Sequence, residues 1–426
     1  MPKYLISKKE LLLAFLLVGL IATSDAVWAI GKPARSGSGY TEKCYKSSDP
    51  DLVINNCTRA VASRKLSGKN LAFAFYKRGN AYSQKGDYDR AIQDYDQAIR
   101  LNPGHAIAFS NRGVAYARKG DYDRAIQDYN QAIRLNPKHA DSFSNRGVAY
   151  RRKEDYDRAI QDYDQAIRLN PKHVSAWYNR GNAYRRKGDY DRAIQNYDQA
   201  IRLNPKYANA FSNRGVAYAR KGDNDRAIQN YDQAIRLNPN YVNAFYNRGN
   251  AYRRKGDYER AALDYDQVIR LNPKHANAYT NRGLMHFYQG QFTAAVPDFS
   301  TAVKFTPTNL YRILLLYLAQ ARAGTDAREG LEQATVGLDL KEWPGPIVSM
   351  YLAKVPDQVV FDAVSDADPT RERQKRCQAY FYVGQQLLIR QNNSDAAKMF
   401  REAIATDAST LFEYQAARVE LKRLEN

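Results

Sequence analysis

The sequence predicts an all-α protein, a right-handed α-solenoid of stacked helix pairs. Three observations predict this class. The motif Asn-Arg-Gly-(Val or Asn)-Ala-Tyr begins at Asn111 and returns every 34 residues up to Asn247. Leu-Asn-Pro recurs at the same interval, from Pro103 to Pro273. Between these landmarks the apolar residues follow the helical period, and a single helix pair can bury its apolar face only by stacking on neighbouring pairs.

Seven repeats of 34 residues fill the segment 72–309. Within a repeat, positions 4, 8 and 11 fall within roughly 60° of one another and form one face of the first helix, helix A. Gly at position 15 ends helix A, and Asp at positions 16 and 18 opens the second helix, helix B. Arg at position 29 and Pro at position 32 end helix B. The repeats start at Ala72, Ala106, Ala140, Val174, Ala208, Val242 and Ala276.

This pattern resembles the tetratricopeptide repeat (TPR) family. That family has an aromatic residue at position 4, Gly at 8, Tyr at 11, Ala at 20, an aromatic residue at 24, Ala at 27 and Pro at 32. The resemblance implies a solenoid that binds another polypeptide on its concave side. A two-helix coiled coil would need sustained heptads, which are absent. Repeat 2 matches the pattern with Phe109, Gly113, Tyr116, Ala125, Tyr129, Ala132 and Pro137.

The N-terminus has the features of an export signal. Lysines precede the apolar run 11–22, and small residues follow it. Residues 1–29 are therefore predicted to be a signal peptide, cleaved after Ala26 or Ala29. A buried helix or a retained anchor is the alternative, but the run is shorter than the roughly 20 residues that span a bilayer. We expect an exported protein, soluble after cleavage and periplasmic in a Gram-negative cell.

Residues 30–71 are predicted to form a degenerate helical cap. Cys44 and Cys57 align with positions 11 and 24 of a repeat, which face each other between paired helices. In an oxidising compartment this predicts a Cys44–Cys57 disulfide, worth about 3 kcal/mol by loop entropy. Two buried thiols are the alternative. Cys377 would stay free or pair between chains.

Helical periodicity continues through residues 310–426, with helices expected at 310–323, 327–338, 371–391 and 394–405. One segment, 377–410, aligns as a diverged repeat without its proline. The matching residues are Tyr380, Gly384, Ala396, Phe400 and Ala403.

This C-terminal region is similar to the NlpI-type periplasmic adaptor family. The resemblance implies a helical adaptor that forms a homodimer and holds a periplasmic protease or peptidoglycan hydrolases. The family's lipidation cysteine is missing here, so only the scaffold role is carried over. The similar segments are Leu316-Tyr317-Leu318-Ala319, Trp343–Leu352, Tyr380-Phe381-Tyr382-Val383-Gly384 and Phe412-Glu413-Tyr414.

Positions 2, 5, 6, 9, 12 and 13 of helix A lie opposite the core face and are predicted to line the concave groove. An Asn ladder at position 6 can pair with an extended peptide backbone, as the similar ladder in the repeats of O-GlcNAc transferase implies. Local hydrogen bonding is the alternative. The ladder consists of Asn111, Asn145, Asn179, Asn213, Asn247 and Asn281.

Arginines at positions 12 and 13 form a basic stripe in the same groove. The formal net charge is +20, and residues 72–309 carry +15 of it. Because the guanidinium fork suits carboxylate and phosphate groups, the groove should prefer an acidic partner. A solvated face balanced by the Asp at position 16 is the alternative. The stripe contains Arg118, Arg151, Arg152, Arg185, Arg186, Arg220, Arg253 and Arg254.

Enzymatic activity, cofactors and metal binding are not expected. The sequence has no phosphate loop, nucleophile elbow or zinc motif, and most of its histidines stand at position 34. Acid pairs such as Asp94 and Asp96 are interpreted as the surface of helix B. Nucleic acid is not an expected partner, because the tyrosines at positions 11 and 24 pack between helices.

Together these features predict an exported TPR scaffold whose groove binds an extended, acidic polypeptide and organises cell-envelope proteases or hydrolases. The alternative is a non-catalytic module that binds an anionic envelope glycan or another polyanion.

Overall fold

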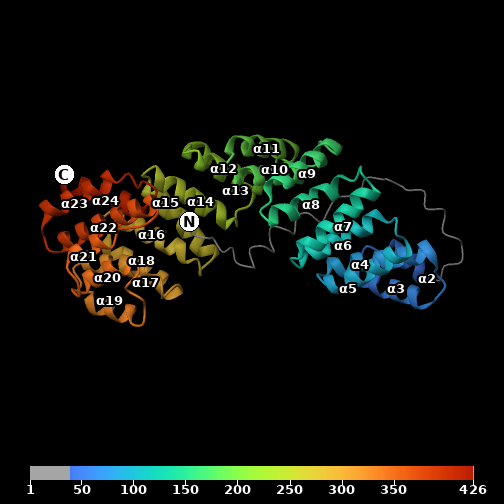
Figure 1. The fold of residues 1–426 in the computed structure, drawn as a ribbon, viewed down its shortest axis with the longest axis horizontal. Coiled ribbons are helices and arrows are strands. Elements are labelled where there is room, and N and C mark those ends of the chain that lie inside the picture. Colours follow the sequence, from blue (N-terminus) through green and yellow to red (C-terminus); the bar gives the residue numbers. More distant parts are fainter. Residues whose placement is uncertain (1–38, 426) are drawn as a thin grey trace. The chain divides into compact units, whose positions relative to one another are not determined.

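The structure, a computed structural model, describes residues 39–425, and every regular element in that range is an α-helix (Figure 1). The predicted all-α class is confirmed. The predicted signal peptide, residues 1–29, lies outside the described residues. None of the described helices combines the length and the apolar character that a membrane span requires. The chain divides into two compact parts, Met1–Pro137 and Lys138–Asn426.

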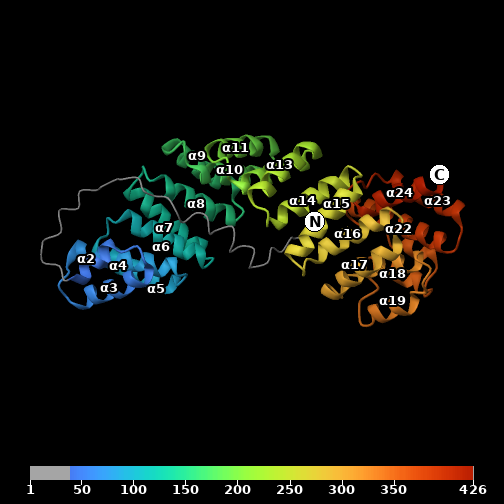
Figure 2. The same ribbon diagram turned by 180° about the vertical axis from the view of Figure 1, so that it is seen from behind.

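In the N-terminal part, each helix packs against the next one along the chain (Figure 2). Repeat 1 consists of α4 and α5, and repeat 2 of α6 and α7. The helices are α2 (Gly39–Lys46), α3 (Pro50–Ala62), α4 (Gly68–Gln84), α5 (Tyr88–Leu101), α6 (Ala106–Arg118) and α7 (Tyr122–Leu135).

The C-terminal part contains repeats 3 to 7 as the pairs α8–α9 to α16–α17, followed by seven further helices. The repeat helices are α8 (Ala140–Arg152), α9 (Tyr156–Leu169), α10 (Val174–Arg186), α11 (Tyr190–Leu203), α12 (Ala208–Arg220), α13 (Asn224–Leu237), α14 (Val242–Arg254), α15 (Tyr258–Leu271), α16 (Ala276–Tyr288) and α17 (Phe292–Phe305). The others are α18 (Leu310–Arg322), α19 (Arg328–Thr335), α20 (Gly345–Tyr351), α21 (Asp357–Asp362), α22 (Pro369–Ile389), α23 (Asn393–Ala405) and α24 (Phe412–Glu425).

A glycine at position 8 brings helix A of each repeat against the aromatic ring at position 24 of helix B. A Cβ atom placed on Gly181 would lie 2.8 Å from Cε1 of Tyr197, whose side chain is fully buried. Any larger residue would therefore push the two helices apart. The same contact recurs at Gly384 against Phe400, so the pair α22–α23 packs in the same way as the repeats.

The turn between helices A and B is built from a glycine and a cap. Gly188 adopts a φ of 83°, which terminates α10. The side chain of Asp189 then accepts a hydrogen bond of 3.0 Å from the amide of Arg192 and caps α11. In repeat 3 the glycine is replaced by Glu154, with a φ of 62°. A side chain in this conformation costs about 1 kcal/mol.

The N-terminal cap consists of α2 and α3, which Cys44 and Cys57 join through a disulfide. Both cysteines are fully buried and share an apolar cluster with Ala74 and Ala81 of α4. Helix α4 begins at Gly68, with the extended residue Ser67 before it. The predicted boundary between residues 71 and 72 therefore falls inside a helix, because helix A of repeat 1 carries an additional turn.

The region after residue 309 does not form a separate packing unit. One apolar core extends from Ala261 in repeat 6 to Ala417 in α24 and includes side chains of α16 to α23. Helix α24 also reaches repeat 7, where the Tyr288 hydroxyl donates to the carbonyl oxygen of Phe412. The predicted boundary between residues 309 and 310 is thus a change in sequence pattern rather than a break in the core.

Gln378 is the centre of a buried polar network in the C-terminal part. Its Oε1 accepts hydrogen bonds from Nε1 of Trp343 at 2.8 Å and from the Tyr311 hydroxyl at 3.2 Å. Its Nε2 donates to Oε1 of Glu413 at 2.9 Å, whereas Oε2 of Glu413 has no partner among the described residues. Burial raises the pKa of Glu413 to about 7. A second buried acid, Glu420, is paired with Arg322 and Arg423.

The disulfide can be tested on protein prepared from its native cell. We expect the intact mass to rise by the mass of two hydrogens on reduction in denaturant. All three cysteines then become reactive to iodoacetamide, whereas without reductant only Cys377 reacts in denaturant. Cys377 is buried and should stay unreactive until the protein unfolds. An unchanged mass after reduction would mean that Cys44 and Cys57 are thiols.

The pKa of Glu413 predicts a pH-dependent stability. Because the folded pKa of about 7 lies above the ordinary value of 4.5, the protein holds one more proton than its unfolded chain between these values. The contribution of Glu413 to the free energy of unfolding is therefore most favourable below about pH 4.5. The free energy of unfolding falls as pH rises from there through 7, by up to about 3 kcal/mol. Urea denaturation at pH 5 and pH 8 measures the fall.

We expect Glu413→Gln to abolish most of this fall and to be more stable than wild type at pH 8. Glu420→Gln is the matched control. It should destabilise at both pH values, since it leaves Arg322 and Arg423 with a neutral partner. A Glu413→Gln protein that loses as much stability as wild type between pH 5 and pH 8 would contradict the assignment.

Candidate peptide-binding surface

Position 6 of helix A is Asn in six repeats, yet these side chains fall into two groups. In repeat 5, Nδ2 of Asn213 donates to the Tyr178 hydroxyl at 2.8 Å and to Oδ1 of Asn182 at 2.9 Å, both in repeat 4. Asn111 and Asn281 make the corresponding bonds to the repeats before them. These three amides take part in contacts between repeats.

The partners explain this pattern. Repeats 1, 4 and 6 carry Tyr at position 5 and Asn at position 9, whereas repeats 2, 3 and 5 carry Ser and Val there. The Asn at position 9 also accepts from the tyrosine at position 24 of its own repeat, as in the 2.9 Å bond from Tyr197 to Asn182. Three four-residue clusters result. They are Tyr76, Asn80, Tyr95 and Asn111; Tyr178, Asn182, Tyr197 and Asn213; and Tyr246, Asn250, Tyr265 and Asn281.

Asn145, Asn179 and Asn247 have no such bonds. The repeat before Asn247 presents Ser212 and Val216, which offer no equivalent of the Tyr–Asn pair. Across residues 39–425, the structure gives the side chains of these three asparagines no hydrogen bond. Their amides are half-buried and keep their capacity to donate and accept.

A ladder of buried Arg–Asp contacts joins the repeats, and sequence reasoning missed it. Arg248, at position 7, donates through Nε and Nη2 to both oxygens of Asp264 at 2.9 and 2.6 Å. Its Nη1 donates to Asp232 of repeat 5 at 2.6 Å. Asp264 is 3% exposed. Burial raises the pKa of Asp264, and the hydrogen bonds and charge of Arg248 oppose that rise.

The interpretation of Asp94 and Asp96 as helix B surface is therefore wrong for Asp94. Asp94 is buried and accepts two bonds of 2.8 Å from Arg78, while Asp96 is half-buried and pairs with Arg112 of the next repeat. The signal was present in the sequence, because Arg at position 7 and Asp or Asn at position 23 recur at a spacing of 16 residues in every repeat.

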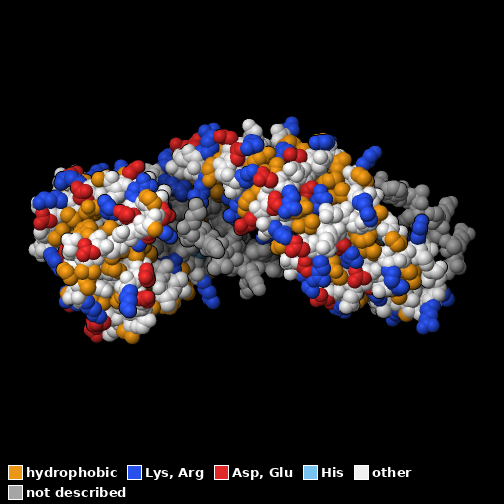
Figure 3. All heavy atoms as spheres, in the orientation of Figure 1, with side chains coloured by type: hydrophobic (Ala, Val, Ile, Leu, Met, Phe, Trp, Pro, Cys, Tyr) orange, Lys and Arg blue, Asp and Glu red, His pale blue; other side chains and the backbone are white. Residues whose placement is uncertain are grey.

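Two further basic positions are also neutralised. Lys at position 14 pairs with Asp at position 18 of the preceding repeat, as Lys221 does with Asp191. Arg at position 19 pairs with the capping Asp at position 16, as Arg226 does with Asp223. Figure 3 accordingly shows basic and acidic side chains interspersed over the visible surface.

The predicted stripe at positions 12 and 13 contains arginines that are not paired in this way. Arg186, Arg220 and Arg254 are exposed, and Arg151, Arg185 and Arg253 are half-buried. None of these six makes an ion pair with an acidic side chain among the described residues. The predicted face of helix A thus contains six arginines without an acidic partner. Among the described residues, the arginines at position 29 of helix B, such as Arg202 and Arg270, also make no ion pair.

Three of the five histidines act as helix caps. Nδ1 of His105 accepts from the amide of Ala108 at 3.3 Å, and His173 and His275 cap their helices in the same way. Among the described residues no group of His, Cys, Asp and Glu has the arrangement of a metal site.

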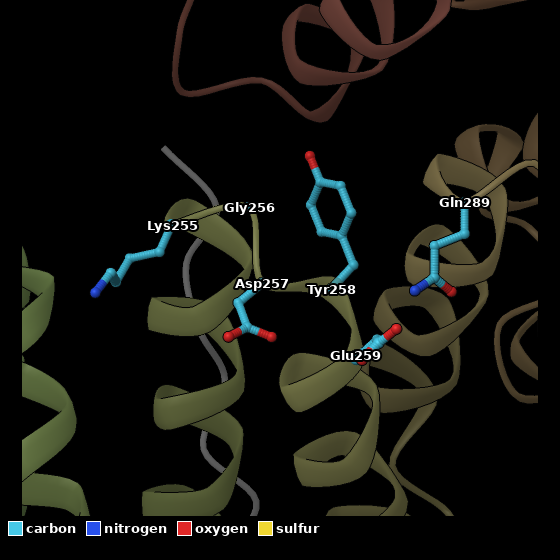
Figure 4. Close-up of a pocket in the computed structure, with 6 residues that line it drawn as sticks. All are labelled: Lys255, Gly256, Asp257, Tyr258, Glu259 and Gln289. Carbon is cyan, nitrogen blue, oxygen red and sulfur yellow. The ribbon is translucent and has the colours of Figure 1, made fainter. Parts of the chain in front are cut away.

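A shallow depression lies at the turn between α14 and α15 (Figure 4). Its lining includes Lys255, Tyr258 and Gln289. Asp257 in this lining caps α15 by accepting from the amide of Arg260 at 3.1 Å, and Lys255 pairs with Asp225. Because these charged groups already serve the repeat structure, the depression offers less to a ligand than the face of helix A.

The two groups of asparagines should respond differently to mutation. Asn213→Ala leaves Oδ1 of Asn182 without one of its donors and should lower the free energy of unfolding by about 1 kcal/mol. Asn247→Ala is the matched control, at the same position of the next repeat, and should change it by less than about 0.5 kcal/mol. Urea denaturation followed by circular dichroism measures both, and equal losses would contradict the division.

Comparison with known proteins gives three sets of family matches. A model described as TPR repeat matches residues 149–188, 181–222 and 217–255. Two models described as tetratricopeptide repeat match residues 76–140 and 246–309, and 128–161. No curated protein matches the chain.

Solved structures similar to this chain include that of MamA, with 28% sequence identity over 37% of this chain and 93% of that chain and a TM-score of 0.35. The structure titled YrrB, a TPR protein with an unusual peptide-binding site, is 26% identical over 43% and 95%, with a TM-score of 0.38. A tetratricopeptide repeat protein from Parabacteroides merdae is 24% identical over 58% and 98%, with a TM-score of 0.45.

The family matches run without a break from residue 76 to residue 309, which is more than half of the 426 residues. The same residues form the helix pairs with Gly at position 8 against the ring at position 24. The chain belongs to the tetratricopeptide repeat family.

Proposed function

We propose that this protein is an exported adaptor that binds an extended, acidic segment of another protein on the helix A face of repeats 3 to 6. Tetratricopeptide repeats are protein-interaction modules, and stacked repeats provide extended binding surfaces. The observation that carries the proposal concerns six of the arginines at positions 12 and 13, which make no ion pair with an acidic side chain among the described residues, whereas the arginines at positions 7 and 19 are paired. The six are Arg151, Arg185, Arg186, Arg220, Arg253 and Arg254.

The unpaired arginines lie close enough to one another to interact. Arg254 is exposed as a whole residue, but partial desolvation of its guanidinium lowers its pKa, and the charges of Arg253 and Arg220 add to this effect. Like charges held together without a counter-charge raise the energy of the free protein. An anionic ligand relieves that repulsion and gains charge-assisted hydrogen bonds, so this surface favours acidic partners.

The asparagines supply the second element of recognition. Asn179 and Asn247 stand seven residues before Arg186 and Arg254, and a separation of seven residues returns to nearly the same side of a helix. An amide that donates and accepts suits the backbone of an extended peptide. The combination favours a polypeptide over a ligand that offers charge alone.

Export and the role of the C-terminal region belong to the same proposal. The disulfide in the N-terminal cap is typical of oxidising compartments, which supports export to a periplasm. The similarity of residues 310–426 to the NlpI-type family supports a scaffold that dimerises and brings a protease or hydrolase to the bound segment.

The test reverses the charge of this face. The variant carrying Arg185→Glu, Arg186→Glu, Arg253→Glu and Arg254→Glu should bind a fluorescein-labelled peptide of twelve glutamates at least about 100-fold more weakly than wild type. Fluorescence anisotropy at low and physiological salt measures the affinity, and circular dichroism checks the fold.

The matched control makes the same change in net charge on helix B, with Arg168→Glu, Arg202→Glu, Arg236→Glu and Arg270→Glu. It should retain most of the affinity. Equal losses in the two variants would mean that net charge alone attracts the peptide, and undiminished binding by the helix A variant would reject the surface. Binding to polygalacturonate without binding to the peptide would favour an anionic glycan as the ligand.

A further inference from the structure

Two of the Tyr–Asn clusters in the C-terminal part lie beside an arginine. Arg185 follows Tyr178 by seven residues, and Arg253 follows Tyr246 by seven. Side chains at this separation on a helix lie almost in line, two turns apart. Each arginine is therefore next to a cluster of tyrosine hydroxyls and asparagine amides, in repeats 4 and 6.

The effects on tyrosine pKa values agree with this placement. Burial raises the pKa of Tyr197, and the positive charge of Arg185 partly offsets the rise. Burial likewise raises the pKa of Tyr265, and Arg253 offsets it. Arg151 of repeat 3 also acts on Tyr197, so the cluster of repeat 4 lies near two guanidinium groups.

Both arginines have an unused donor. Nε of Arg185 and Nε of Arg253 are buried and have no hydrogen-bond partner among the described residues. No acidic side chain of that part of the chain pairs with either guanidinium. A buried donor on a charged group without a partner is costly, and an anion bound beside the guanidinium would compensate its charge.

The repeat between them lacks these features. Repeat 5 has Ala219 at position 12, and its Asn213 is already bonded to the cluster of repeat 4. Repeats 4 and 6 instead combine a half-buried arginine at position 12, an exposed arginine at position 13 and a Tyr–Asn cluster. Repeat 3 has Arg151, whose Nε also lacks a partner among the described residues, but it has no Tyr–Asn cluster.

We propose that repeats 4 and 6 form two similar subsites, centred on Arg185 and Arg253, that each bind one carboxylate of an extended acidic peptide. This inference rests on the proposed function and specifies which residues recognise the carboxylates of the ligand. Arg186 with Asn179, and Arg254 with Asn247, flank the two subsites and bind the adjoining carboxylate or backbone.

The separation of the subsites sets the spacing of the carboxylates. Helix α10 contacts α12, and α12 contacts α14. Since packed helix axes lie about 8–10 Å apart, repeats 4 and 6 are separated by about 20 Å. An extended chain advances about 3.3 Å per residue, so the two acidic side chains should be about six residues apart.

The experiment compares two fluorescein-labelled peptides of the same length and charge, built from Ser and Gly with two glutamates. The glutamates are six residues apart in one peptide and adjacent in the other. The full-length protein should bind the spaced peptide about tenfold more tightly, because only that peptide engages both subsites. Arg185→Gln and Arg253→Gln should each remove this preference.

Arg220→Gln is the matched control, since it removes one positive charge in repeat 5, and it should keep the tenfold preference. Equal affinity of the wild-type protein for both peptides would overturn the two subsites while leaving the proposed function intact. The absence of binding by either peptide, and by the twelve-glutamate peptide, would overturn the proposed function as well. The comparison of peptides on wild-type protein does not depend on how the variants fold.

Discussion

The contact between Gly at position 8 and the aromatic ring at position 24 is the constraint on which the rest of the structure depends. A Cβ atom on Gly181 or Gly215 would lie within 2.8 Å of the ring, so the helices of a repeat meet at the closest approach that a backbone allows. This contact fixes the rotation of helix A about its axis. Because the glycine side faces helix B, positions 6 and 13 of helix A face away from it.

Ion pairs between side chains fix the alignment of each repeat against its neighbour. Arg248 bonds to Asp264 in its own repeat and to Asp232 in the repeat before it, so a shift of one repeat against the next would leave a half-buried guanidinium unpaired. Breaking a buried pair of this kind costs about 3–5 kcal/mol. The arginines at position 7 thus stabilise the stack. The arginines of helix A that lack an acidic partner, such as Arg185 and Arg253, have no such structural role in ion pairing among the described residues.

The fold was largely predictable, because a fixed period with glycine, proline and alanine at set positions encodes one helix pair repeated seven times. The helices expected at 310–323 and 394–405 correspond to α18 and α23. Helices α20, α21 and α24 were not predicted as elements. The first two have seven and six residues, which is too short for a helical period to be recognised. Packing on the large C-terminal core stabilises them, and tertiary packing of this kind cannot be inferred from the local sequence pattern.

The surface was predictable only in part, and the asparagines show why. Six identical residues at one position suggested a uniform ladder, but the partner of each lies in the preceding repeat, at positions 5 and 9. Asn213 meets Tyr178 and Asn182, whereas Asn247 follows a repeat that offers serine and valine. An alignment of the repeats shows Asn at position 6 in both cases and does not reveal the difference between them. Whether the asparagine at position 6 is already bonded is therefore a property of pairs of adjacent repeats, and in this array those pairs are of two kinds.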